Sequence, residues 1–77
     1  MEVIKVGATS VPRLVASSIT GMMDDGKEFV VRAMGSNAVN QAVKACAIAG
    51  VAVSPSFTQL EIAGEERTAI EMEVIKQ

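Results

Sequence analysis

The residues of this chain that are best suited to contacting a ligand lie together just after Gly35. Asn37, Asn40, Gln41 and Lys44 fall on one side of an expected helix when successive residues advance by about 100°. Unpaired backbone N–H groups at a helix N-terminus favour an anion such as a phosphate, and amides and a cation would add to that preference. The sequence therefore predicts an anion-binding stripe made of Gly35, Ser36, Asn37, Asn40, Gln41 and Lys44.

The chemistry of this stripe permits more than one partner. Amide residues are neutral to poor helix formers, so a face that is only solvated would more cheaply use Glu and Lys. Three amides in one stripe therefore indicate contact. They could meet phosphates and base edges, or a second protein chain, because amides tolerate the loss of water better than charges do. A solvated helix face is the third interpretation, and the sequence leaves all three open.

Four scattered cations could add a weak basic collar to the stripe, or could be ordinary surface charges; they are Arg13, Lys27, Arg32 and Lys44. Each phosphate contact contributes roughly −0.9 to the log–log salt slope, so a few contacts predict binding that fades near physiological salt unless many copies act together. The only aromatic residues are Phe29 and Phe57. A platform for stacking single-stranded bases is therefore not expected.

The residue types that the chain lacks narrow the chemistry further. It has no histidine and a single cysteine, which excludes an internal disulfide, the usual zinc and iron–sulfur ligand sets and every nucleophile triad that depends on histidine. Cys46 falls on the apolar side of the expected helix, where we expect a small buried hydrophobe and not a reactive thiol. No metal, no cofactor and no enzymatic activity are expected.

Length and composition favour one small domain over residues 1–77. A chain of 77 residues buries only about 60% of the surface that its unfolded form exposes, so association would help a marginal core. A surplus of alanine in the expected helix, together with the small size, predicts a homodimer. No apolar run approaches the roughly 20 residues of a membrane span, and Met1–Lys5 lack the features of a signal peptide. We therefore expect a cytoplasmic location and no membrane partner.

The net charge of −2 conceals a division along the chain. Residues 3–60 carry five cations and three carboxylates, which gives +2, whereas residues 61–77 carry two cations and five carboxylates, which gives −3; Glu2 supplies the rest. The two parts should attract different partners. Within the acidic part, Glu65, Glu66 and Arg67 are expected to form either a solvated turn or a local ion pair worth ~0–1 kcal/mol.

Hydrophobic spacing predicts a strand, a helix and a second strand in the first half of the chain. The strand covers Glu2–Val6, and a helix follows that begins near Pro12, with Thr9 or Ser10 close enough to cap it. It ends in a turn at Asp24–Gly26. Residues 28–34 are apolar on both faces, which is typical of a central strand. Because a helix joins the two strands, they should be parallel.

The second half of the chain predicts a helix and a hairpin. The helix covers about Ser36–Ala49 and packs through Val39, Ala42, Val43 and Cys46. Gly50–Phe57 is expected to be a connector, because proline cannot lie inside a central strand. Alternating patterns then predict strands over 58–62 and 70–74 around a turn at 63–67. The order βαβαββ indicates an α+β fold, a two-layer sandwich of two helices on a four-stranded mixed sheet.

Several long motifs of the chain resemble the stage V sporulation protein S family of bacteria. They are the segments Gly35–Ala45 and Gly64–Ile70, together with Glu2–Val6 and Ser10–Pro12. The likeness covers nearly the whole chain, although the stretch from Gly50 to Phe57 is shorter than the family's usual link to the third strand. The resemblance implies a protein associated with sporulation.

That family in turn resembles the archaeal chromatin protein Alba, which implies the same βαβαββ fold. In Alba-like proteins the first loop and the glycine turn before the second helix present basic residues to the nucleic-acid backbone. Here Ala8–Ser10 stand where lysines are expected and Ser36 and Asn37 where arginine is expected, while Arg32 matches a basic position. The scaffold and the glycine turn therefore carry over, and most of the charge does not.

Residues and resemblance together predict a non-enzymatic, Alba-like nucleic-acid-binding homodimer, with weak and largely sequence-independent binding. Its site would comprise Arg13, Arg32, Gly35, Ser36, Asn37, Asn40, Gln41 and Lys44. The alternative is a sporulation-associated regulatory or assembly protein that acts through protein contacts, which a pI near 4.9 and a first loop without lysine favour.

Overall fold

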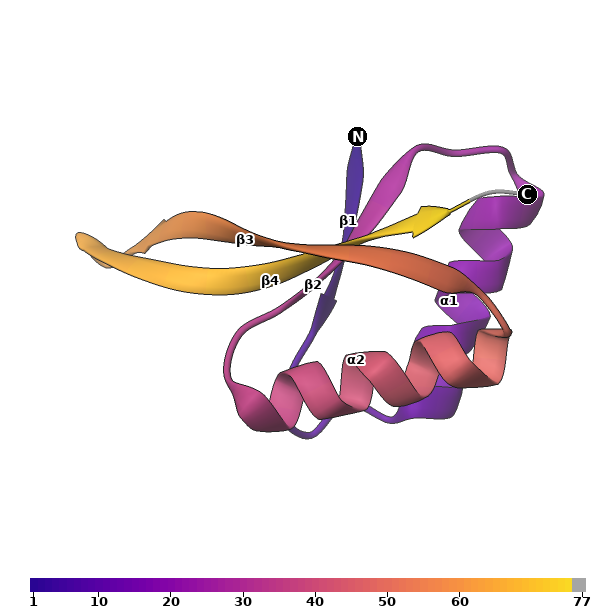
Figure 1. The fold of residues 1–77 in the computed structure, drawn as a ribbon, viewed down its shortest axis with the longest axis horizontal. Coiled ribbons are helices and arrows are strands. Elements are labelled where there is room, and N and C mark those ends of the chain that lie inside the picture. The colour runs from indigo at the N-terminus through magenta and orange to yellow at the C-terminus, as the bar shows by residue number, and fades with distance from the viewer. Residues whose placement is uncertain (76–77) are drawn as a thin grey trace.

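The helices and strands follow one another along the chain in the predicted order βαβαββ. A computed structural model describes residues 1–75, and its elements are β1 (Glu2–Val6), α1 (Pro12–Asp24), β2 (Phe29–Ala33), α2 (Ser36–Ala49), β3 (Ala52–Ile62) and β4 (Glu65–Ile75). The strands form one sheet in the order β1-β2-β4-β3, and both helices lie on one side of it (Figure 1). The predicted α+β two-layer sandwich with a mixed sheet is confirmed. Lys76, counted above in the acidic part, lies outside the described residues.

The core forms between the helices and the first two strands. β1 pairs in parallel with β2 because α1 carries the chain back between them, and β2 also pairs antiparallel with β4. β2 is therefore central, and Val30 and Val31, which point to opposite faces, are both buried. On the helix side, Ile4, Val6, Val31 and Ala33 pack with Ile19 of α1 and a row of alanines on α2.

The start of α1 differs from the prediction in one respect. Pro12 does lie in the first turn, but the N-cap residue is Val11 and no side chain caps the helix. The Ser10 hydroxyl instead accepts a hydrogen bond from the Gly7 N–H at 2.8 Å, within the loop itself. The prediction that Thr9 or Ser10 caps α1 is therefore wrong, because Ser10 closes the loop that precedes the helix.

The predicted connector at Gly50–Phe57 is also wrong for most of its length. β3 begins at Ala52 and runs without interruption through Pro55, which lies opposite Met72 of β4. β3 is an edge strand, and an edge strand tolerates proline because the missing N–H can face solvent. The rule against proline in a central strand holds, but the strand in question is not central.

The β3–β4 turn is tighter than predicted. Ala63 and Gly64 both have positive φ, 53° and 78°, as in the two-residue turns that match the twist of a hairpin. Residues 65–67, predicted as part of the turn, therefore already belong to β4, where Arg67 and Glu65 form an exposed ion pair at 3.6 Å. The outer part of the hairpin extends beyond β2 as a two-stranded arm (Figure 1).

The helices are short in comparison with a bilayer. Within residues 1–75, neither α1 nor α2 has the length and apolar character needed to cross a membrane.

Candidate nucleic-acid interface

The topology places the first loop of the chain beside α2. Parallel strands end at the same edge of a sheet, so the segments that follow β1 and β2 both emerge there. The loop from Gly7 to Val11 runs along α2 before α1 begins (Figure 1). The side-chain amide of Gln41 donates a hydrogen bond to the Ser10 carbonyl oxygen at 3.2 Å. This bond joins the loop and the helix into one surface.

The predicted polar stripe of α2 faces outward along most of its length. Ser36, Asn37, Asn40 and Lys44 are exposed, while Gln41 is half-buried by its contact with the loop. Among described residues, the Gln41 amide is thus the one member of the stripe with a hydrogen bond to another element.

The opposite side of α2 packs through a narrower stripe than predicted. Ala38, Ala42, Ala45 and Cys46 are buried and Val39 is half-buried, but Val43 is 51% exposed. The assignment of Val43 to the packing face is wrong. The small alanine side chains bring α2 close to the sheet along a thin line, and Val43 lies on the flank of that line.

The N-terminal ends of both helices are open to an anion. Neither helix has a side-chain cap, and neither has an acidic residue in its first turn. In α2 the first N–H to bond back along the chain is that of Val39, to the Gly35 carbonyl oxygen at 3.0 Å, so the N–H groups before it have no partner within the helix. They add to the positive end of the helix dipole.

Carboxylates are absent from the segments that build this surface. Residues 3–23 and 29–60 contain no Asp or Glu. All nine acidic residues lie elsewhere, around the amino-terminal ends of β1 and β2 or in the hairpin and β4: Glu2, Asp24, Asp25, Glu28, Glu61, Glu65, Glu66, Glu71 and Glu73. The net charge of the chain is −2, but the segments that contain Arg13 and Lys44 carry no acidic residue. These two cations therefore have no carboxylate close to them in sequence.

The structure brings Arg13 and Lys44 together. Both line a shallow groove of about 530 Å³ between the start of α1 and the second half of α2. The remainder of the groove is apolar and includes Val11 and Ile48, two of the exposed large hydrophobic residues of the chain. Nothing in the types or spacing of Val11 and Ile48 assigns them to a shared surface. The signal in the sequence that marks this region is the lack of any Asp or Glu in residues 3–23 and 29–60.

Arg32 does not join the other predicted site residues. It alternates with Val31 and Ala33, which face the helices, so its side chain lies on the opposite face of the sheet. There its Nε donates to a carboxylate oxygen of Glu71 at 2.7 Å, and Nη2 donates to the same oxygen. Glu71 therefore neutralises the one cation at which the chain matches the Alba-like pattern.

Lys27 also lies apart from the candidate interface. Its ammonium group is 3.9 Å from the Glu2 carboxylate, at the end of the sheet where β1 and β2 begin. The predicted four-residue collar thus divides into one pair, Arg13 and Lys44, and two separate cations.

Cys46 is buried, as predicted, and burial raises the pKa of its thiol. A raised pKa keeps the sulfur protonated and unreactive at neutral pH. Among residues 1–75, no three acidic or cysteine side chains lie close enough together to hold a metal ion.

Comparison with known protein families finds a match over almost the full chain. Residues 2–77 match the model of the family described as Stage V sporulation protein S (SpoVS).

Proposed function

We infer that this chain, which belongs to the stage V sporulation protein S family, acts in sporulation as a cytoplasmic, non-enzymatic protein that binds nucleic acid weakly and with little sequence preference. The observation that carries the proposal is the carboxylate-free surface formed by the first loop, the start of α1 and α2. On such a surface a few donors and cations suffice to attract a polyanion although the whole protein is acidic.

Each part of the surface would have a distinct role in binding. The free N–H groups at Gly35–Asn37 would hold one phosphate at the start of α2. Lys44 and Arg13 would neutralise phosphates further along the backbone. Asn40, exposed between these positions, would donate to phosphate or sugar oxygens. Contacts of this kind carry no sequence information, which is why little sequence preference is expected.

A salt titration tests this function. We expect labelled duplex DNA to bind with a Kd of about tens of micromolar at low salt and more weakly as salt is added, because only a few phosphates are contacted. Lys44→Gln and Arg13→Gln should each lower the magnitude of the log–log salt slope by about 0.9, because each removes roughly one phosphate contact. Fluorescence anisotropy with duplex DNA, single-stranded DNA and RNA of one sequence provides the measurement.

Lys27→Gln is the matched control for these variants. Lys27 lies at the end of the sheet where β1 and β2 begin, far from the candidate interface. Its substitution removes the same charge and so should leave the salt slope unchanged. Absence of binding at tens of micromolar, or binding that does not depend on salt, would contradict the proposal.

We propose that the binding unit is a homodimer, in which a second copy of the chain covers the core-facing side of β3. Val53, Pro55 and Phe57 lie opposite Val74, Met72 and Ile70 in the antiparallel pair, and therefore share the core-facing side of the sheet. The helices pack chiefly on β1 and β2, and Phe57 is 78% exposed. A sheet face of this kind is stable when another layer covers it, and a second copy would supply that layer.

Phe57→Ser is expected to weaken self-association at least about tenfold, because burial of a phenylalanine contributes about 1.5–3 kcal/mol. Sedimentation equilibrium over a range of protein concentrations measures the effect. Leu14→Ser, which alters an exposed apolar side chain on α1, is the control and should leave association unchanged. A monomeric wild-type protein, or equal effects of the two substitutions, would refute this interface.

A protein partner is the second candidate function, and the groove beside Lys44 favours it. Val11 and Ile48 expose apolar surface between Arg13 and Lys44, a combination that suits an acidic segment with apolar side chains. If this is the function, Ile48→Ser should abolish a stoichiometric, nuclease-resistant complex. Nucleic-acid affinity would in that case be negligible for the wild-type protein.

A further inference from the structure

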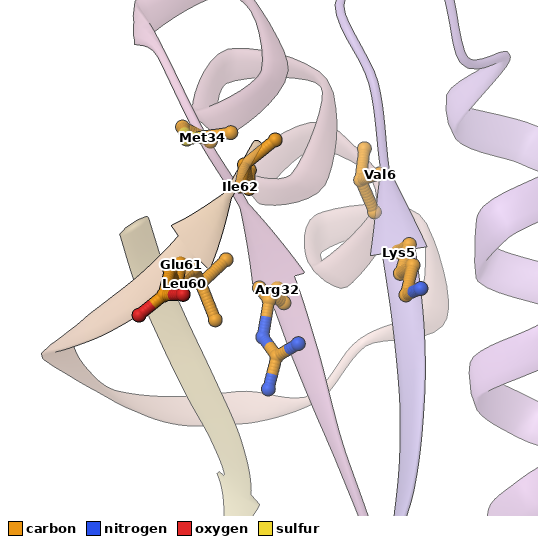
Figure 2. A pocket seen from close by; sticks show the side chains of 7 residues that line it. All are labelled: Lys5, Val6, Arg32, Met34, Leu60, Glu61 and Ile62. Carbon is orange, nitrogen blue, oxygen red and sulfur yellow. The ribbon is translucent and has the colours of Figure 1, made fainter. Parts of the chain in front are cut away.

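A second cavity lies where β1, β2 and the end of β3 approach one another (Figure 2). Its volume of about 360 Å³ lies within the range of small-molecule sites in proteins. Lys5 and Arg32 contribute positive charge to its lining, while Met34, Leu60 and Ile62 contribute apolar surface. None of these residues belongs to the groove between α1 and α2.

The cationic side of this cavity is held in place before any ligand binds. Arg32 uses Nε and Nη2 to donate to one oxygen of Glu71, and a guanidinium group has five N–H donors in all. The ion pair fixes the plane of the guanidinium while leaving further donors unused. A side chain that is already ordered loses little conformational entropy when it binds a ligand.

Lys5 is the cation of this cavity that has no direct ion-pair partner among residues 1–75. It lies directly opposite Arg32 in the parallel pair of β1 and β2. Glu71 balances Arg32, and Glu61, which also lines the cavity, offsets the charge of Lys5, so the site has a positive side at Lys5 and Arg32 but no net charge.

The apolar side of the cavity is exposed to solvent. Ile62 and Met34 retain 44% and 36% of their accessible surface, and Leu60, half-buried, lies beside them. Glu61 also lines the cavity, and its carboxylate disfavours a ligand with two negative charges, or a polyanion, by repulsion. The donors of Lys5 and Arg32 therefore suit a ligand with a single, localised negative charge, and the apolar residues suit an apolar body attached to it.

We propose that this cavity binds a small organic monoanion, a carboxylate attached to an aliphatic or similar apolar group. The carboxylate would accept hydrogen bonds from Lys5 and the unused donors of Arg32, and the apolar group would lie against Met34, Leu60 and Ile62. This site is independent of nucleic-acid binding, because it uses neither α2 nor the first loop.

Hexanoate is a suitable probe, with its neutral amide, hexanamide, as the matched ligand. On protein with labelled Met and Ile methyl groups, hexanoate should shift the NMR signals of Met34 and Ile62 saturably, with a Kd in the region of a millimolar, as expected for so small a ligand. Lys5→Gln should raise that Kd about fivefold through loss of the partly exposed charge pair. Lys44→Gln, on the other surface, should not change it.

Each other outcome counts against the proposal. No saturable shift of the Met34 and Ile62 methyl signals would show that the cavity does not bind the ligand class. Equal affinity for hexanamide, or an unchanged Kd in Lys5→Gln, would show apolar adsorption without recognition of charge. Tighter binding of hexyl phosphate than of hexanoate would overturn the assignment to a monoanion. Circular dichroism of Lys5→Gln verifies that this exposed substitution leaves the fold intact.

Discussion

Replacement of Ile19 by alanine is expected to lower the free energy of unfolding by about 2–5 kcal/mol. Ile19 has 0% of its surface exposed and lies in the core between α1 and the sheet. Its truncation removes buried methyl groups and leaves a cavity among residues whose backbones are fixed by the sheet. At about 0.05–0.15 kcal/mol per residue, a chain of 77 residues has roughly 4–12 kcal/mol of stability in total, so the loss is a large share of it.

Urea unfolding followed by far-ultraviolet circular dichroism measures this loss, since the chain has no Trp or Tyr to report by fluorescence. Ile19→Val, which removes one methylene group, should cost only about 0.5–1.5 kcal/mol. Leu14→Ala alters an exposed position of the same helix and should be close to neutral. If Ile19→Ala were no more destabilising than Leu14→Ala, the packing described for α1 would be wrong.

Gly35→Ala is expected to destabilise the protein by about 1–3 kcal/mol, for a reason that has nothing to do with space. Gly35 has φ 90° and ψ 154°, in a region of backbone conformation that is essentially restricted to glycine. An added Cβ would meet no atom within 4 Å. The whole cost is therefore conformational, and it falls on the residue that directs the chain from β2 into α2.

Gly50→Ala is the matched control for this prediction. Gly50 ends α2 with φ 70° and ψ 33°, the left-handed conformation, where alanine costs about 1–2 kcal/mol. Gly35→Ala should be at least as destabilising in the same urea experiment. A neutral Gly35→Ala variant would mean that the turn can adopt an ordinary conformation, and would remove the argument that it is built to present N–H groups.

The local order of the fold could be predicted from the sequence because local signals mark it. Pro12 and Gly50 bracket the helices, and the alternation in β4 identifies a strand with one buried face. The positions that could not be predicted depend on strand order. The sequence predicts a connector at Pro55, because none of the residues around it indicates that β3 lies at an edge of the sheet.

For the candidate site, too, the part that depends on local spacing could be predicted, and the part that depends on strand pairing could not. The polar stripe of α2 follows from helical spacing, and most of it is exposed as expected. Arg32 joins the predicted site because it matches a basic position of Alba-like proteins and is one of the four cations of the expected collar. Its true partner, Glu71, lies 39 residues away in sequence, and the contact exists only because β4 pairs beside β2. Pairings between distant strands of this kind leave little trace in one sequence.

Proline in β3 also limits how copies of this chain can meet. A free edge of 11 residues offers a row of unpaired backbone groups on which a further strand could be added, and repeated addition leads to open-ended aggregates. Pro55 has no N–H and so offers no donor at its position in this strand. The dimer proposed above would use the flat side of the strand instead, a contact that closes on itself as a pair and does not propagate into a fibre.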